Sequence, residues 1–253
     1  MKSFLSYLGG KSLLAGKIAA RIPDHHCYCE VFAGAAWLLF RKEESTVEII
    51  NDINVELVTL FRVVKNHLDE FVRYLRWMLV ARDEFERLKE AKPETLTDIQ
   101  RAIRFFYLLK AGYASRIKNP TFSVGTTGRS NFNLLRIEEE LSQVHLRLVR
   151  VYIENLPFEK FIPRFDRPDT FFYLDPPYLG FENCYGDGIF RREDFTKLNE
   201  LVKGLKGKFI LSINDHPEIR LLFKGFRIKK EATLYTAAKT TKKKVNELVI
   251  SNF

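Results

Sequence analysis

The sequence predicts an α/β fold with a doubly wound, mostly parallel sheet that is interrupted by a helical lobe. Two observations favour this fold: short apolar runs alternate with helical segments at both ends of the chain, and a long middle region has only helical periodicity. The 253 residues suffice for one large domain with a smaller insert. We therefore expect residues 1–55 and 149–253 to form one sheet domain, and residues 56–148 a separate lobe.

The first region contains a predicted β-α-β unit. Tyr28–Phe32 is a short apolar run followed by a Gly/Ala turn, which predicts a buried strand. Ala35–Lys42 is predicted to be a helix, and Val47–Ile50 a second strand that ends at Asn51 and Asp52. Strands joined in this way lie parallel, so both should end at the same edge of the sheet.

The middle region is predicted to be mostly helical. Apolar residues recur at helical spacing in five segments: Leu57–Val64, Phe71–Leu79, Phe85–Lys89, Ile99–Leu109 and Leu134–Leu148. Between the last two lies Gly112–Asn133, a loop rich in Gly, Ser, Thr and Asn that also carries Arg116, Lys118 and Arg129.

The third region returns to alternating strands and helices. One helix is predicted over Phe195–Leu205. Five strands are predicted: Val149–Ile153, Thr170–Leu174, Lys208–Ile213, Phe226–Ala232 and Leu248–Asn252. Lys239–Lys244 is expected to be a basic loop between the last two strands.

The charge balance is basic. Lys and Arg total 41 against 32 acidic residues, a net charge of +9. This balance favours a polyanionic partner, because neutralised phosphates release counterions. The start of the chain lacks a signal-peptide pattern, and no segment has the apolar length of a membrane span. We therefore expect a soluble, cytoplasmic protein.

The cysteine content predicts neither a disulfide framework nor a metal site. Cys27, Cys29 and Cys184 are an odd number in a large chain. The run His25–Cys29 suggests zinc, but no second Cys/His cluster follows at ligand spacing. A buried strand with two small thiols is the better interpretation of this run.

Asp175-Pro176-Pro177-Tyr178 follows directly on the apolar run Phe171–Leu174, where ligands bind in open α/β sheets. Such a site suits a flat base that bears an amino group. Asp175 and the Pro176 carbonyl can accept hydrogen bonds from the amine, the prolines fix the direction of that carbonyl, and Tyr178 offers a stacking face. The plain alternative is a Pro-Pro turn that ends a strand; the apolar strand before it and the flanking Asp and Tyr favour function.

A second pair of residues suggests a nucleoside site. A glycine after the first strand, Gly34, lets the chain pass close to a ligand. Asp52, 18 residues later, ends the second strand and can accept hydrogen bonds from ribose hydroxyls. The plain alternatives are a tight turn for Gly34 and a helix N-cap for Asp52.

Two other nucleotide-binding motifs are excluded. Gly9–Ser12 resembles the end of a phosphate-binding loop, but position 5, where the earlier glycine belongs, is Leu5. No G-x-G-x-x-G follows the first strand, which argues against a nicotinamide cofactor.

The order of the motifs resembles that of the Dam-like N6-adenine DNA methyltransferases, which have a class I methyltransferase fold. The motifs that carry the resemblance are Tyr7–Lys11, Glu30–Ala36, Asn51–Asn54, Asp175–Tyr178, Leu211–Asn214 and Asn246–Asn252. The resemblance implies that S-adenosylmethionine donates the methyl group and that no metal takes part. It assigns the cofactor to Tyr7, Lys11, Phe32, Ala33, Gly34, Asp52, Ile53, Phe158 and Asp175, and catalysis to Asp175, Pro176, Pro177 and Tyr178.

The implied substrate is double-stranded DNA with a flipped adenine, as in DNA methylation by restriction–modification systems. Because a flipped base requires a firm hold on the duplex, we expect phosphate contacts from Arg116, Lys118, Arg129, Lys242 and Lys243. Residues 56–148 would then form the target-recognition lobe. Nothing in the sequence requires an oligomer.

Three departures from the family pattern are visible. Ala36 stands where a second glycine is usual, no acid precedes Phe158, and Phe122–Asn133 matches the Gly-rich recognition hairpin only loosely. The alternative acceptors are cytosine N4, adenine in RNA or a glutamine amide, and a catalytically inert DNA-binding relative is the alternative from another class.

Overall fold

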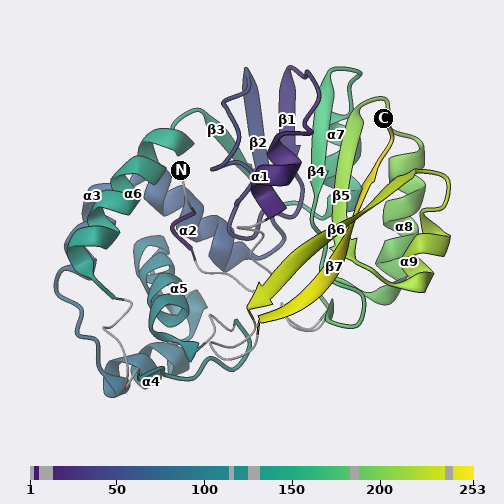
Figure 1. Cartoon of the computed structure of the whole chain (residues 1–253). Coiled ribbons are helices and arrows are strands. Elements are labelled where there is room, and N and C mark those ends of the chain that lie inside the picture. Colours follow the sequence, from purple (N-terminus) through teal and green to yellow (C-terminus); the bar gives the residue numbers. More distant parts are fainter. Residues whose placement is uncertain (1–2, 6–13, 114–116, 125–131, 183–187, 237–241) are drawn as a thin grey trace.

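The computed structural model describes residues 3–5, 14–113, 117–124, 132–182, 188–236 and 242–253, with the side chains of 233–245 left out (Figure 1). Its described strands form one seven-stranded sheet in the order β3-β2-β1-β4-β5-β7-β6. The first five lie parallel, and β7 runs antiparallel between β5 and β6. The strands are β1 Cys27–Glu30, β2 Val47–Asn51, β3 Val151–Glu154, β4 Thr170–Leu174, β5 Lys208–Asn214, β6 Arg227–Thr236 and β7 Lys242–Ser251.

Apolar side chains cover both faces of the sheet, as parallel strands require. On β4, Phe171 and Tyr173 face one core cluster, whereas Phe172 and Leu174 face the other. The first cluster includes α1 Leu14–Ala19, α2 Val55–Asn66, α3 Leu68–Leu75, α5 Asp98–Ala111 and α6 Leu134–Leu148. The second includes α7 Phe158–Phe165, α8 Arg192–Lys203 and α9 Pro217–Leu222. This two-sided cover confirms the predicted doubly wound α/β fold.

The middle region is helical, as predicted. In Figure 1, α3, α4, α5 and α6 gather beside the β3 edge of the sheet, and the β6–β7 hairpin reaches toward them from the other side. Helix α4 Arg82–Glu90 and the short 3₁₀ helix Pro93–Thr95 complete the region. The apolar core of these helices continues into the sheet, because Phe61 of α2 and Phe106 of α5 belong to the same buried cluster as Phe171 and Tyr173 of β4. Phe4 joins the two helices: it stacks on Phe106 and contacts Phe61 edge-on. That residues 56–148 form a lobe separate from the sheet domain stays a prediction.

Three details of the sequence prediction were wrong. Ala35–Lys42 forms hydrogen-bonded turns, not a helix, because Gly34 and Ala36 adopt φ values of +49° and +50°. Helix α3 ends at Leu75, short of the predicted Leu79. Lys242–Lys244 belong to strand β7, whereas a loop was expected. Among the described residues, no helix is long and apolar enough to cross a bilayer.

Candidate active site

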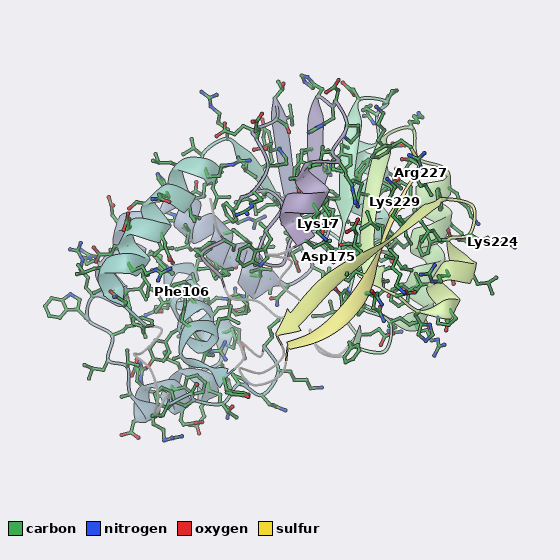
Figure 2. The ribbon with its side chains drawn as sticks, in the orientation of Figure 1. Lys17, Phe106, Asp175, Lys224, Arg227 and Lys229 are labelled. Atoms are coloured by element: carbon green, nitrogen blue, oxygen red, sulfur yellow. The ribbon has the colours of Figure 1, made fainter. Side chains whose placement is uncertain are left out.

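A cavity of about 360 Å³ lies at the edge of the sheet where β1, β2 and β4 end. We call it the edge cavity. It is lined by residues 30–35, 51–54, 156–159 and 188–191, by Asp175, Pro177 and Tyr178, and by five further side chains: Trp37, Tyr173, Glu193, Asp194 and Lys197. Asp175 lies in the middle of Figure 2, between the helical region marked by Phe106 and the β6–β7 hairpin.

The loop after β1 is held by the acid that ends β2. Asp52 accepts hydrogen bonds from the Gly34 backbone N–H at Oδ2 and from the Asn54 N–H at Oδ1, both at 2.9 Å. Burial raises the pKa of Asp52, although these hydrogen bonds oppose the rise. The N-cap of α2 is Asn54, so Asp52 does not have the plain role of a helix cap. The structure therefore brings the two predicted nucleoside residues, Gly34 and Asp52, into direct contact.

Asn51 joins three loops around the cavity. Its buried side chain donates hydrogen bonds to the carbonyls of Val31 (3.0 Å) and Leu156 (2.9 Å). The same side chain accepts a hydrogen bond from the Leu156 N–H at 2.8 Å. Asn155 adds a hydrogen bond from its side chain to the Asp52 carbonyl. The loops after β1, β2 and β3 are thereby fixed relative to one another, a role of Asn51 that its place in the sequence does not predict.

Three phenylalanines form an aromatic wall of the cavity. The Phe32 ring lies 5.7 Å from that of Phe158 and 5.8 Å from that of Phe190, and the last two are also 5.8 Å apart. Phe158 begins helix α7. Phe190 was missed, because it precedes α8 without a recognisable motif. Glu159, the residue after Phe158, also lines the cavity and supplies an acid next to the aromatic.

Asp175 is oriented by a hydrogen-bonded chain from β4 and β5. Ser212 Oγ donates to Asp175 Oδ1 at 3.1 Å. The hydroxyls of Tyr173 and Ser212 are 2.8 Å apart, so Tyr173 is the donor to Ser212 when Ser212 donates to Asp175. Burial, and then the charge of Asp175, raises the pKa of Tyr173, which keeps this phenol protonated. One carboxylate oxygen of Asp175 thus has a fixed direction.

The rest of the tetrapeptide is held from β5 and β7. Pro176 and Pro177 are buried. Asn214 accepts a hydrogen bond from the Leu179 N–H at 3.0 Å and donates to the Leu179 carbonyl at 3.2 Å. The Tyr178 hydroxyl donates to Glu247 Oε1 at 2.6 Å. The loop after β4 is therefore held at the side chain of Tyr178 and at the backbone of the next residue, Leu179.

Glu30 is a buried acidic residue that lines the cavity. It is 2% exposed, and its Oε2 accepts hydrogen bonds from the Tyr28 hydroxyl (2.8 Å) and the Leu39 N–H (3.1 Å). Burial raises its pKa to about 8, against the effect of these hydrogen bonds. The carboxyl of Glu30 is therefore mostly protonated at neutral pH.

Only some of the remaining predicted residues belong to the described part of the chain. Tyr7, Lys11, Arg116 and Arg129 lie outside the described residues, as do the side chains of Lys242 and Lys243. Ala33 is buried in the cavity wall, and Ile53 is 39% exposed at its rim. Lys118 is exposed, and its neighbours Ile117 and Asn119 line a second cavity of about 440 Å³ that shares Asn54 with the edge cavity.

The predicted thiol pair lies away from the edge cavity. Cys27 and Cys29 of β1 have their sulfur atoms 3.9 Å apart, and burial raises the pKa of Cys29. In the described part of the chain, no three His, Cys, Asp or Glu side chains gather in a way that could hold a metal ion.

Comparisons with known proteins agree with this geometry. Residues 7–237 match the family model of the D12 class N6 adenine-specific DNA methyltransferases. The chain is 27% identical to the type II methyltransferase M.CviBI of Paramecium bursaria Chlorella virus NC1A, over 89% of this chain and 88% of that protein. It is 26% identical to the type II methyltransferase M1.LlaDCHI of Lactococcus lactis subsp. cremoris, over 100% and 96%. It is also 26% identical to the DNA adenine methylase of Escherichia coli K12, over 85% and 81%.

The family decides among the acceptors that the sequence left open, because its description specifies N6 of adenine in DNA. Cytosine N4, adenine in RNA and a glutamine amide are thereby set aside, and so is the inert relative. The chain belongs to the D12 class N6 adenine-specific DNA methyltransferases.

Proposed function

We propose that the edge cavity holds S-adenosylmethionine and a flipped adenine side by side, with Asp175 between them. One observation carries this proposal: a single cavity is lined both by the Gly34 and Asp52 loops and by Asp175 and Tyr178. A reaction between two bound molecules requires them to share one cavity, since positioning supplies much of the rate enhancement.

The residues present fit a nucleoside that carries a sulfonium. Phe32, Phe158 and Phe190 offer apolar faces to an adenine ring. The left-handed backbone at Gly34 places a residue without a side chain at the cavity wall. The Gly34 and Asn54 N–H groups donate to different oxygens of Asp52, and the carboxylate has lone-pair capacity left for a ribose hydroxyl.

Ala33 and Ile53 would complete this side of the cavity. By resemblance, Tyr7 and Lys11 would contact the same ligand. When bound, S-adenosylmethionine supplies an electrophilic methyl group.

Asp175 prepares the acceptor. The exocyclic amine of adenine is a poor nucleophile because the ring delocalises its lone pair. A hydrogen bond from this amine to Asp175, and a second to the Pro176 carbonyl, favour a more tetrahedral nitrogen whose lone pair is free to react. Ser212 fixes Oδ1 of Asp175, so the carboxylate need not reorient during the reaction. Tyr178 offers its ring to the face of the base.

We propose that DNA lies between the helical lobe of residues 56–148 and the β6–β7 hairpin. The hairpin reaches toward the lobe across the side where Asp175 lies (Figures 1 and 2). Lys118 is exposed beside the second cavity, which borders the edge cavity through Asn54. Arg116, Lys118 and Arg129 would contact phosphates from the lobe, and Lys242 and Lys243 from the hairpin.

The test is Asp175→Ala, compared with Asp24→Ala, an exposed aspartate before β1 at the other end of the sheet. We expect Asp175→Ala to lower single-turnover methylation of duplex DNA by at least about 100-fold, the order lost when one group that stabilises a transition state is removed. Unfolding by urea should show a folded protein, and the control should methylate normally. Near-normal turnover by Asp175→Ala would refute the assignment.

A further inference from the structure

Glu247 is a buried acid that contacts the catalytic tetrapeptide from a distant part of the chain. It lies on β7, 69 residues after Tyr178, and is 3% exposed. Its Oε1 accepts a hydrogen bond from the Tyr178 hydroxyl at 2.6 Å, within the range of strong hydrogen bonds to carboxylates. A buried carboxylate needs hydrogen-bond partners, and the aromatic residue of the tetrapeptide is one partner of Glu247.

The sheet determines where Glu247 lies. In the antiparallel register of β5 and β7, Glu247 is opposite Asn214. Asn214 holds the backbone of Leu179 by two hydrogen bonds, while Glu247 holds the side chain of Tyr178. Neighbouring positions of two paired strands thus restrain both the backbone and the phenol of one short loop.

The hydrogen bond restrains the Tyr178 ring at its far end. The ring is attached to the backbone through two rotatable bonds, and buried prolines precede it. An anchored hydroxyl fixes the remaining rotations, so the face of the ring keeps one orientation. Burial raises the pKa of Tyr178, as do the nearby charges of Glu247 and Asp175, so the hydroxyl keeps the proton that it donates.

We propose that Glu247 is a positioning residue for methyl transfer: it anchors the Tyr178 hydroxyl so that the ring presents its face to the target adenine. This inference rests on the proposed function, in which Tyr178 is the stacking surface for the flipped base. Glu247 acts through Tyr178 and not on the reacting atoms.

The test uses the full-length protein and two duplexes. One has adenine at the target position and serves to measure the single-turnover rate of methylation. The other has 2-aminopurine there, which cannot be methylated at N6 but whose fluorescence reports how the flipped base stacks. Glu247→Ala should lower the single-turnover rate by about 10- to 100-fold, the range for one lost hydrogen bond to a charged group. Its duplex complex should differ in fluorescence from wild type, while the dissociation constant for S-adenosylmethionine changes less than about twofold. Glu247→Gln keeps an acceptor and should restore most of the rate.

Two further variants separate positioning from general destabilisation. Ile250→Val, in the buried part of the same strand, should lower the unfolding temperature and leave the rate unchanged. Tyr178→Phe removes the other partner, so the double variant Tyr178→Phe/Glu247→Ala should be no slower than the slower single variant. Additive losses, or a normal rate and fluorescence in Glu247→Ala, would overturn the proposal.

Tyr178→Ala distinguishes failure of the role proposed for Glu247 from failure of the proposed function. If Tyr178→Ala alters rate and fluorescence but Glu247→Ala does not, Tyr178 is the base platform and only the role of Glu247 is overturned. If neither variant alters them, the stacking role of Tyr178 and the role of Glu247 are overturned together.

Discussion

Glu30 should make the stability of this protein fall as pH rises, and Glu30→Gln should remove that dependence. The folded-state pKa of about 8 lies above the ordinary value of 4.5, so folding favours the protonated carboxyl. The contribution of Glu30 to the free energy of unfolding is fully present below pH 4.5 and is lost as the pH rises through 8. Each pH unit in this window corresponds to about 1.4 kcal/mol, which gives about 3 kcal/mol lost at pH 7 and about 5 kcal/mol above pH 8.

Glutamine imitates the protonated form. Its carbonyl oxygen can accept the hydrogen bonds that Tyr28 and Leu39 now donate to Oε2. Urea unfolding of wild type and Glu30→Gln at pH 5, 7 and 9 should therefore show similar stability at pH 5 and a growing advantage for the variant toward pH 9.

Comparison of the two proteins cancels the contribution of every other titrating group. Glu44→Gln, the same substitution at an exposed position, is the matched control. Its urea unfolding is compared with that of wild type at the same three pH values, and the difference in stability should not grow toward pH 9. Parallel pH curves for wild type and Glu30→Gln would refute the reasoning.

Two other substitutions test the frame of the site. Asn51→Ala leaves three backbone groups around the cavity without their partner, so it should lower the free energy of unfolding by about 3 kcal/mol or more and weaken S-adenosylmethionine binding measured by calorimetry. Unchanged stability would show that water replaces these bonds. Ser212→Ala removes the hydrogen bond from Ser212 to Oδ1 of Asp175 and should lower the single-turnover rate about 10-fold with little change in cofactor affinity. An equal loss in cofactor affinity would mean that Ser212 shapes the cofactor side instead.

The local pattern of apolar and polar residues was sufficient to predict most of the strands and helices. The run Phe171–Leu174 is apolar at every position, and all five residues of β4, Thr170–Leu174, are buried. Helix α6 has the predicted bounds, Leu134–Leu148, because its apolar residues keep one face and Asn133 caps its start. In such segments, propensity, periodicity and capping favour the same structure.

The site could be predicted only in part, since many of its contacts join distant residues. Asp175 and Tyr178 were found because each has a chemical use visible in one short motif. Asn51, Ser212 and Glu247 act through partners 20 to 105 residues away, and nothing near them in the sequence indicates those partners. Sheet order and register determine these pairs, and neither follows from the local pattern of any one strand.

The wrong helix at Ala35–Lys42 has a physical explanation that also bears on the cofactor loop. Ala36 is fully buried at φ +50°, a conformation that costs an alanine roughly 1–2 kcal/mol. Burial of its methyl group offsets part of this cost, about 0.8 kcal/mol. The Asp52–Gly34 hydrogen bond and the Glu30–Leu39 hydrogen bond then hold the segment from both ends. The loop keeps its shape because two acids from the ends of β1 and β2 hold its backbone, and helix propensity within 35–42 cannot compete with them.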